Sequence, residues 1–322
     1  MHLYKHKSAP GIDKLYVICT VSNPARFKSR YELYHRFKLG CERVGVQLVT
    51  VELALGDRPF EVTDAGNPRH VQLRTWDELW LKESCINIGI SRLPQDWEYV
   101  AWIDADTEIL RHDWPAEICH LLQQYQVIQL FDTAVDLAHD GSTLQINKGF
   151  VSTWQERQGS AMAPGDYYYA GTAGKAVYHP GFAWAARREA IDALGGLFDT
   201  AILGSGDHHM AWGLVGKIGS HTPRGLTPAY HRNLTMWQDR ATRHIRQDVG
   251  FMAGTLVHHF HGAKRNRFYR DRWKILQQHK YDPDRDLKRD WQGLWSFSDQ
   301  GVRMRNDLRS YFRQRSEDSI ES

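Results

Sequence analysis

The sequence predicts an α/β fold built on a mostly parallel, doubly wound sheet, with a basic helical extension at the C-terminal end. Short apolar runs rich in β-branched and aromatic residues alternate with segments whose apolar residues recur every three or four positions, which is typical of such sheets. The 322 residues suit one large domain with an extension, and 42% hydrophobic with 25% charged residues excludes a disordered or fibrous chain.

The first elements form a β-α-β unit. Residues 14–21 are an apolar run that ends before Asn23-Pro24, so we expect a buried strand followed by a turn. Apolar residues recur at helical spacing over 27–44, and 46–55 has the composition of a second strand.

The alternation continues through the middle of the chain. A helix is expected between Leu79 and Leu93, then a strand over 99–103, a helix that begins near Asp113 and a strand over 127–131.

The second half of the chain begins with residues 140–175, which are rich in Gly, Ser, Ala and Tyr and predict a long loop. A strand over 179–186 and a helix over 187–194 follow. Charged and Trp-rich sequence with helices over 268–279 and 300–315 forms the end. We therefore expect a main domain over 1–264 and a basic helical extension over 265–322 that packs on it.

Charge is divided unevenly along the chain, although the formal total is only +3. Residues 1–216 carry a net charge of −6, residues 217–315 a net charge of +12, and the last seven residues −3. Clustered Lys and Arg are typical of proteins that bind polyanions, and an internally paired basic face is the alternative.

Several features bear on where the protein works. No window reaches the roughly 20 apolar residues of a membrane span, and residues 1–7 lack the apolar stretch of a signal peptide. The four cysteines are widely spaced, which disfavours a zinc site or a disulfide framework. We expect a cytoplasmic protein with no membrane partner.

Asp104 and Asp106 follow the apolar strand expected over 99–103. In an extended chain the side chains at positions i and i+2 lie on one face, so two carboxylates can bind one Mg²⁺ or Mn²⁺ there. A pair of solvated carboxylates at a strand end is the alternative.

Three histidines lie within four residues at 258–261, followed by Gly262, Lys264 and Arg265. Imidazoles can bind a metal, and the two cations can bind a diphosphate. If this segment is a strand, His259 and His261 share a face and His258 points away. Surface histidines in a basic loop are the alternative.

Asp207 lies in a glycine-containing turn before an apolar helix. Its carboxylate could be a general base toward a hydroxyl group, or it could cap the helix.

Taken in order, these motifs resemble glycosyltransferases of the GT-A fold, a Rossmann-like fold that uses nucleotide sugars. The segment 259–265 matches the HxxGxxK motif of glycogenin-like members, with arginine in place of the last lysine. The chain is more similar still to phage-encoded members. That likeness extends from Asn23-Pro24 through 82–87 and 206–210 to the ending 311–318.

The resemblance implies a role for each matching residue. Asp104 and Asp106 would hold Mn²⁺ or Mg²⁺ on the donor diphosphate, with His259 or His261 completing the ligand set. The remaining residues expected to bind the donor are Thr20, Asn23, Arg30, Lys82, Asn87 and either Lys264 or Arg265, and those expected to bind the acceptor are Gly181, Trp184, His208 and Arg267.

The reaction implied is transfer of a sugar from a nucleotide diphosphate sugar, with UDP expected as the nucleotide, to a hydroxyl group. Asp207 is the candidate base if the anomeric configuration inverts, and a retaining enzyme would not need it in that role. In some phage relatives the acceptor is a hydroxymethylated pyrimidine of DNA, and the basic segment favours double-stranded DNA here too. For a phage-encoded enzyme the cytoplasm would be that of the host.

Three alternatives remain at this point: a glycosyltransferase acting on a glycan, lipid or protein, a nucleotidyltransferase, and a non-catalytic nucleic-acid-binding protein. The nucleotidyltransferase is disfavoured because residues 22–26 are a poor match to the basic glycine-rich loop that such enzymes use.

Overall fold

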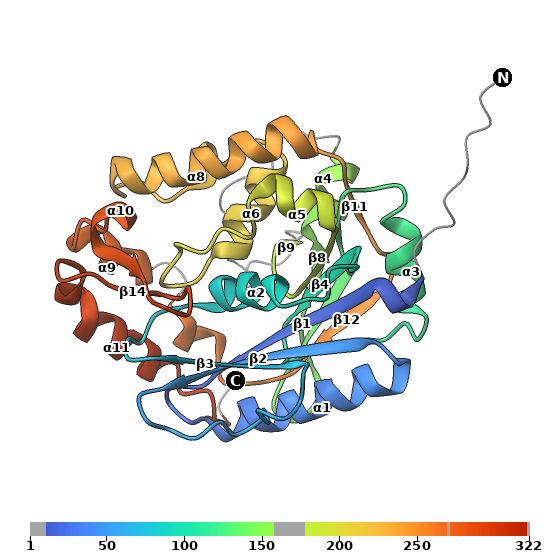
Figure 1. Cartoon of the computed structure of the whole chain (residues 1–322), viewed down its shortest axis with the longest axis horizontal. Coiled ribbons are helices and arrows are strands. Elements are labelled where there is room, and N and C mark those ends of the chain that lie inside the picture. The colour runs from blue at the N-terminus through green and yellow to red at the C-terminus, as the bar shows by residue number, and fades with distance from the viewer. Residues whose placement is uncertain (1–10, 158–177, 269–270, 321–322) are drawn as a thin grey trace.

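The computed structural model describes residues 11–157, 178–268 and 271–320, and its centre is a seven-stranded sheet (Figure 1). The strand order is β11-β6-β10-β4-β1-β2-β3. The strands are β1 Leu15–Ser22, β2 Gln47–Leu55, β3 His70–Thr75, β4 Tyr99–Ile103, β6 Val127–Gln129, β10 Ala183–Arg187 and β11 Val249–Phe251. All pairs are parallel except those of β10 with β4 and with β6. The predicted mostly parallel α/β sheet is confirmed, with one reversed strand in its middle.

Helices cover both faces of this sheet, so its central strands are apolar on both sides. In β1, Ile18 belongs to one hydrophobic core while Val17 and Cys19 belong to the other. Helices α2, α5, α6 and α8 contribute to the first core, and α1 and α3 to the second. Figure 1 shows α1 and α2 on opposite sides of β1 and β2. These helices and the short ones between them are α1 Lys28–Val44, α2 Lys82–Ser91, α3 Trp114–Leu121, α4 Phe150–Glu156, α5 Arg188–Leu194, α6 Gly206–Leu214, α7 Ile218–His221 and α8 Pro228–Arg240.

A second sheet, which the sequence did not predict, has the order β5-β12-β7-β8-β9. Its strands are β5 Thr107–Ile109, β7 Thr133–Leu137, β8 Thr143–Gly149, β9 Tyr178–His179 and β12 Thr255–His258. Strand β12 pairs with β5 on one side and with β7 on the other, so His258 lies opposite both Thr107 and Asp136. This sheet therefore brings the segment after Asp106 beside the histidine segment, which follows it by some 150 positions.

The loop predicted over 140–175 is wrong for its first part, because 143–149 is strand β8 and 150–156 is helix α4. Side chains at alternate positions of β8 are exposed, and Ile146 is 62% exposed, so this strand has no continuous apolar run. The rest of that prediction, 158–175, lies outside the described residues.

The C-terminal region contains the two predicted helices in shortened form. They are α9 Arg272–Gln278 and α11 Arg305–Gln314, and the chain between them forms α10 Pro283–Asp286 and the hairpin β13 Leu287–Arg289 with β14 Trp295–Phe297. Leu308, Tyr311 and Phe312 of α11 are buried in the larger core. The basic segment is thus packed against the α/β unit. In the parts of the chain that are described, no helix has the length and apolar character needed to cross a membrane.

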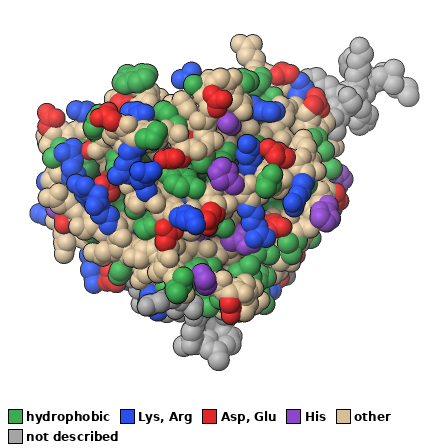
Figure 2. All heavy atoms as spheres, turned by 90° about the horizontal axis from the view of Figure 1, so that it is seen from below, with side chains coloured by type: hydrophobic (Ala, Val, Ile, Leu, Met, Phe, Trp, Pro, Cys, Tyr) green, Lys and Arg blue, Asp and Glu red, His purple; other side chains and the backbone are tan. Residues whose placement is uncertain are grey.

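Some basic side chains of the C-terminal region form ion pairs with acidic side chains of the first half of the chain. Arg305 pairs with Asp77 at 2.9 Å and Arg309 with Glu78 at 3.1 Å, so arginines of α11 contact carboxylates of the acidic half. On the face seen in Figure 2, Lys and Arg side chains are interspersed with Asp and Glu. The net +12 is therefore not a uniform basic surface.

Candidate active site

A cavity of about 270 Å³ opens where β1 and β4 end, at the carboxyl edge of the parallel strands. Ligands of doubly wound sheets bind at this edge. Its walls come from segments far apart in the sequence: the end of β1, the start of α1 and α2, the segment after β4, strand β7, the histidine segment and the residues around α11. The predicted donor-side residues Thr20, Asn23, Arg30 and Lys82 all line it.

Asp104 and Asp106 face this cavity but have different partners. The two residues lie in a tight turn after β4, in which the backbone oxygen of Asp104 accepts hydrogen bonds from the N–H and hydroxyl of Thr107. Asp104 forms an ion pair with Lys82, whereas Asp106 lies beside His258 and His261. The turn replaces the extended chain on which we expected one shared face, so the two carboxylates do not belong to one donor group.

Asp106, His258 and His261 form a compact group of metal-binding type, with one donor atom from each within 4.8 Å of the others. Asp106 Oδ2 is 3.2 Å from Nε2 of His261, and Asp106 Oδ1 is 3.9 Å from Nε2 of His258. Asp106 Oδ1 is buried and has no hydrogen-bond partner among the described residues. A buried carboxylate oxygen without a donor is costly unless a cation is bound there. One carboxylate with two imidazoles fits Mn²⁺ better than Mg²⁺, which prefers oxygen ligands.

Both imidazoles have the tautomer that a metal ligand needs. Asp136 accepts a hydrogen bond from Nδ1 of His258 at 2.6 Å, and the backbone oxygen of His259 accepts one from Nδ1 of His261 at 3.0 Å. Nδ1 is therefore the donor in each ring, and in a neutral ring this leaves the lone pair of Nε2 on the side of Asp106. Burial lowers the pKa of His261 to about 3, which keeps that ring neutral at physiological pH.

The charges of the surrounding carboxylates are set by their neighbours. Burial alone would raise the pKa of Asp106, but positive charges around it, including those of Arg30 and Arg267, hold it below its ordinary value, so it is ionised. Burial also opposes ionisation of Asp136, whose pKa is nevertheless lowered by His258 and Lys264.

His259 does not belong to this group. Its ring contacts Glu108 at 3.3 Å, and Glu108 also pairs with Arg36 at 2.9 Å near the outer surface. A shared face of His259 and His261 was expected only if this segment is a strand, and that condition is not met, because β12 ends at His258.

Lys264 and Arg265 are separated by the fold. Lys264 lines the cavity, where its ammonium group donates to Asp136 at 2.5 Å and to Gln145 at 2.7 Å. Arg265 is exposed and is not among the cavity-lining residues. Of these two predicted alternatives, only Lys264 is placed to contact a ligand in the cavity.

On the opposite wall, Lys82, Glu83 and Asp207 lie close together. Burial would lower the pKa of Lys82, but Asp104, Asp207 and Glu83 raise it, so this lysine is charged. Burial raises the pKa of Glu83 to about 8 and that of Asp104 to about 6. Sequence reasoning missed Glu83 because it lies within an otherwise apolar helix and has no motif.

Two glycines make room for these carboxylates. A Cβ atom at Gly181 would lie 2.2 Å from Oδ2 of Asp207, and one at Gly206 would lie 2.5 Å from Cδ of Glu83. Asp207 itself lies in the first turn of α6, where its Oδ1 accepts from the N–H of His208 at 2.8 Å. Gly181 thus contacts the candidate base. The N-cap position of α6 is occupied by Ser205, so Asp207 lies inside the first turn and is not the capping residue that we considered.

Other predicted site residues have structural partners and do not line the cavity. The ring of His208 contacts the backbone oxygen of His221 at 3.0 Å, and burial lowers its pKa to about 4. The indole of Trp184 donates to the backbone oxygen of Pro180 at 2.8 Å. The side-chain amide of Asn87 donates to the backbone oxygen of Leu197 and accepts from its backbone N–H.

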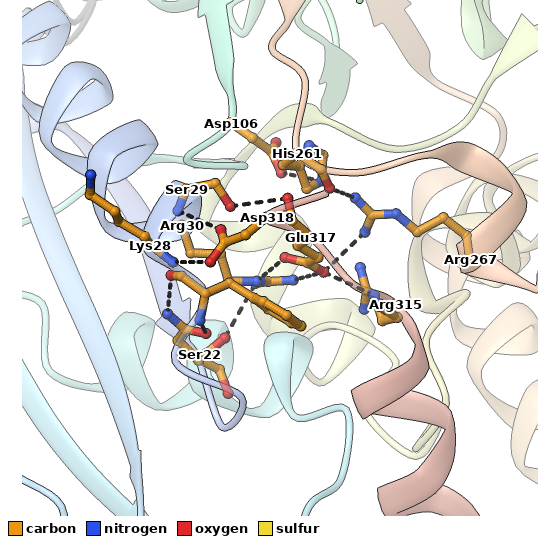
Figure 3. Close-up of polar contacts among 12 residues, drawn as sticks. Ser22, Lys28, Ser29, Arg30, Asp106, His261, Arg267, Arg315, Glu317 and Asp318 are labelled. Carbon is orange, nitrogen blue, oxygen red and sulfur yellow. Dashed lines mark hydrogen bonds and ion pairs between the residues drawn. The ribbon is translucent and has the colours of Figure 1, made fainter. Parts of the chain in front are cut away.

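Two further cavity residues come from the C-terminal region. Arg267, expected on the acceptor side, is buried and donates to the backbone oxygen of His261 at 2.9 Å (Figure 3). Glu317, to which no role was assigned from the sequence, is 1% exposed and contacts Arg267. A single glutamate near the end of a basic segment gives no sequence signal, because two of its arginine partners, Arg30 and Arg267, come from distant positions.

No protein-family model and no curated protein sequence matches this chain. Among solved structures, the chain is similar to the catalytic domain of Drosophila β1,4-galactosyltransferase 7 in complex with xylobiose, and to a mutant of it with manganese, UDP-Gal and xylobiose. Both are 15% identical, with 88% of this chain and 94% of that chain covered and a TM-score of 0.35. The chain is also similar to a 4-diphosphocytidyl-2C-methyl-D-erythritol synthase from Anaerococcus prevotii. The two are 13% identical, with 76% of this chain and 88% of that chain covered and a TM-score of 0.35. These likenesses are too distant to identify a family, so the functional proposal rests on the cavity.

Proposed function

We propose that this protein is a metal-dependent glycosyltransferase that moves a sugar from a nucleoside diphosphate sugar, with UDP as the nucleotide, to an acceptor hydroxyl group. The observation that carries the proposal is the group Asp106, His258 and His261, with its unpartnered carboxylate oxygen, beside cationic side chains in one cavity. A divalent cation bound there would stabilise the negative charge that develops on the leaving diphosphate.

The chain's own residues would divide the remaining work. Lys264 would neutralise the leaving group, and Thr20, Asn23 and Arg30, which line the same cavity, would contact the nucleotide. Asp104, paired with Lys82, would contact the donor next to the cation. We keep Asp104 as a donor-binding residue and propose His258 in place of His259 among the metal ligands.

Asp207 is our candidate for the general base of an inverting reaction. Its carboxylate would accept the proton of the acceptor hydroxyl while that oxygen attacks the anomeric carbon and the bond to the diphosphate breaks. Gly181 would serve the acceptor side by leaving room for this carboxylate.

Calorimetric titration with Mn²⁺ tests the metal group directly. We expect Asp106→Asn and His261→Ala to lose measurable binding, because each removes one of three ligands. His259→Ala and Glu108→Gln, which alter the neighbouring pair outside the group, should bind Mn²⁺ as the wild type does. Equal binding by all four variants would refute the assignment.

For the acceptor we propose double-stranded DNA that carries a 5-hydroxymethylpyrimidine or an already glycosylated base. The support is the net +12 of residues 217–315, because clustered cations give affinity for a line of phosphates. Binding to duplex DNA should then weaken steeply with salt, and binding that is independent of salt would exclude this acceptor.

A glycan, lipid or protein acceptor is the second candidate, favoured by the ion pairs of Arg289 and Arg305 with Asp199 and Asp77, which reduce the charge available to DNA. Transfer of radiolabelled sugar from several UDP-sugars to hydroxymethylcytosine DNA, hydroxymethyluracil DNA and oligosaccharides separates the two. A non-catalytic DNA-binding protein would show no transfer, and Asp104→Asn and Asp106→Asn would leave its DNA binding intact.

A further inference from the structure

The segment Ser316–Asp318 lies between the start of α1 and the loop that begins at Gly262 (Figure 3). The carboxylate of Asp318 accepts from the backbone N–H of Lys28 at 2.8 Å and of Ser29 at 2.9 Å. On the other side, a Cβ atom at Gly262 would lie 2.8 Å from Cα of Glu317, and the φ of Gly262 is +89°. Only glycine permits this close backbone contact, so the segment is built into the cavity wall.

Glu317 is the centre of a cluster of arginines, of which Arg267 and Arg315 are buried and Arg30 is half-buried. Its carboxylate contacts two nitrogens of Arg30, one of them at 2.7 Å, as well as Nη1 of Arg267 at 3.3 Å and Nε of Arg315 at 3.0 Å. The three arginines line the cavity together with Glu317. Arg30 comes from α1, Arg267 from the segment after the three histidines, and Arg315 from the residue that follows α11. All three contact the same carboxylate.

This cluster carries more positive than negative charge. Three guanidinium groups face one carboxylate, which gives these four residues a net charge of +2, and a further anion that interacts with two of the arginines is Asp106 of the metal-binding group. Burial, reinforced by Arg267 and Arg30, lowers the pKa of Arg315 to about 10. Buried cations of like sign repel one another unless an anion lies between them, so the arrangement depends on Glu317 and would gain from a second anion.

Two of the arginines also donate hydrogen bonds to groups other than Glu317. Each guanidinium has five N–H donors. In the described part of the chain, Arg30 uses one of them on the backbone oxygen of Ser22 at 3.2 Å, and Arg267 uses one on that of His261 at 2.9 Å. Arg267 therefore joins Glu317 to a member of the metal-binding group, so a phosphate bound by the cluster would lie beside the metal.

We propose that Glu317 is a positioning residue that holds Arg30, Arg267 and Arg315 as a phosphate-binding cluster, so that the segment Ser316–Asp318 completes the site for the donor's diphosphate. The inference rests on the proposed function and assigns to its donor site three residues, Arg267, Arg315 and Glu317, that were not expected there.

The test is the affinity of the full-length protein for UDP and for inorganic pyrophosphate, measured by calorimetry with Mn²⁺ present. In Glu317→Gln the arginines lose their shared anion and move apart, so we expect both ligands to bind at least about tenfold more weakly, the size expected for charge-assisted hydrogen bonds. In the transfer assay the KM for the donor should rise more than kcat falls.

Glu78→Gln is the matched control, because the side chain of Glu78 is also only 8% exposed and pairs with two arginines of α11, Arg309 and Arg313, but does not line the cavity. It should bind UDP as the wild type does. Arg315→Gln, which keeps Glu317 but removes one cation, should weaken UDP binding too and provides a second variant if Glu317→Gln does not fold.

The outcomes are distinct. If the wild type binds neither UDP nor pyrophosphate, the proposed function fails and this inference with it. If the wild type binds both ligands and Glu317→Gln binds them equally well, Glu317 has only a structural role and the inference fails alone. Tighter binding by Glu317→Gln would also overturn it, because Glu317 would then compete with the ligand for the arginines.

Discussion

Replacing Gly181 by alanine tests the role of Asp207 with the smallest change that the chain allows. The added Cβ would lie 2.2 Å from Oδ2 of Asp207, while ordinary contact begins near 3.4 Å. The carboxylate must therefore move by about 1.2 Å, the difference between these distances. A displacement of about 1 Å of a catalytic group can cost roughly 100-fold in rate.

The stability of Gly181→Ala should change little. The severe clash is with the end of the Asp207 side chain, which can rotate, whereas Cε1 of His179 at 3.0 Å needs to shift by only a few tenths of an ångström. Alanine also lowers the entropy of the unfolded chain, which contributes about 0.4–1 kcal/mol relative to glycine. We expect kcat for sugar transfer to fall about 100-fold while the melting temperature and the Kd for Mn²⁺ stay close to those of the wild type.

The assay is release of UDP in the transfer reaction, with Gly40→Ala as the control, because a Cβ at Gly40 in α1 has no atom within 4 Å. Asp207→Asn sets the lower limit of activity. A Gly181→Ala enzyme with wild-type kcat would show that the position of the Asp207 carboxylate does not matter for catalysis, and the assignment of Asp207 as the base would be wrong.

Two further predictions follow from the buried carboxylates. Asp136→Asn removes the anion that holds Nδ1 of His258, so the affinity for Mn²⁺ should fall about 10- to 100-fold by calorimetry; unchanged affinity would mean that Asp136 does not orient the ligand. Burial would raise the pKa of Asp286, but Arg303 and Arg285 lower it from 3.8 to about 2. Because its pKa is lower in the folded state, Asp286 stabilises the fold above pH 4, and about 2 kcal/mol should be lost as the pH falls from 5 to 2. Denaturant unfolding of Asp286→Asn should show a smaller loss over that range than the wild type, and equal acid sensitivity would contradict the pairing.

The central sheet could be predicted because its signals are local. Strands β1 and β4 are continuous apolar runs, and α1 has a clear helical period, so burial pattern and chain order define them. Asp104 and Asp106 were found for the same reason, since they follow a strand that must end at the ligand-binding edge.

The second sheet and the ligand set could not be predicted in the same way. Strand β5 has three residues and pairs with β12 across some 150 positions, which no local pattern indicates. The histidine that joins Asp106 depends on whether β12 ends at His258 or continues, and a shift of one residue reverses every side chain. Asp136 had only one signal, a polar residue at an inward position of β7.

Closure of the cavity wall by Glu317 has a consequence for synthesis of the chain. Arg30 and Glu317 are 287 positions apart, so a growing chain has made α1 and β1 long before the residue that holds Arg30 leaves the ribosome. Until then, the start of α1 lacks both the carboxylate of Glu317 and the capping carboxylate of Asp318. A nascent chain would thus form strands of the central sheet before it completes the donor site. A purification tag fused directly after residue 318 would disturb the contacts of Glu317 and Asp318 with the start of α1.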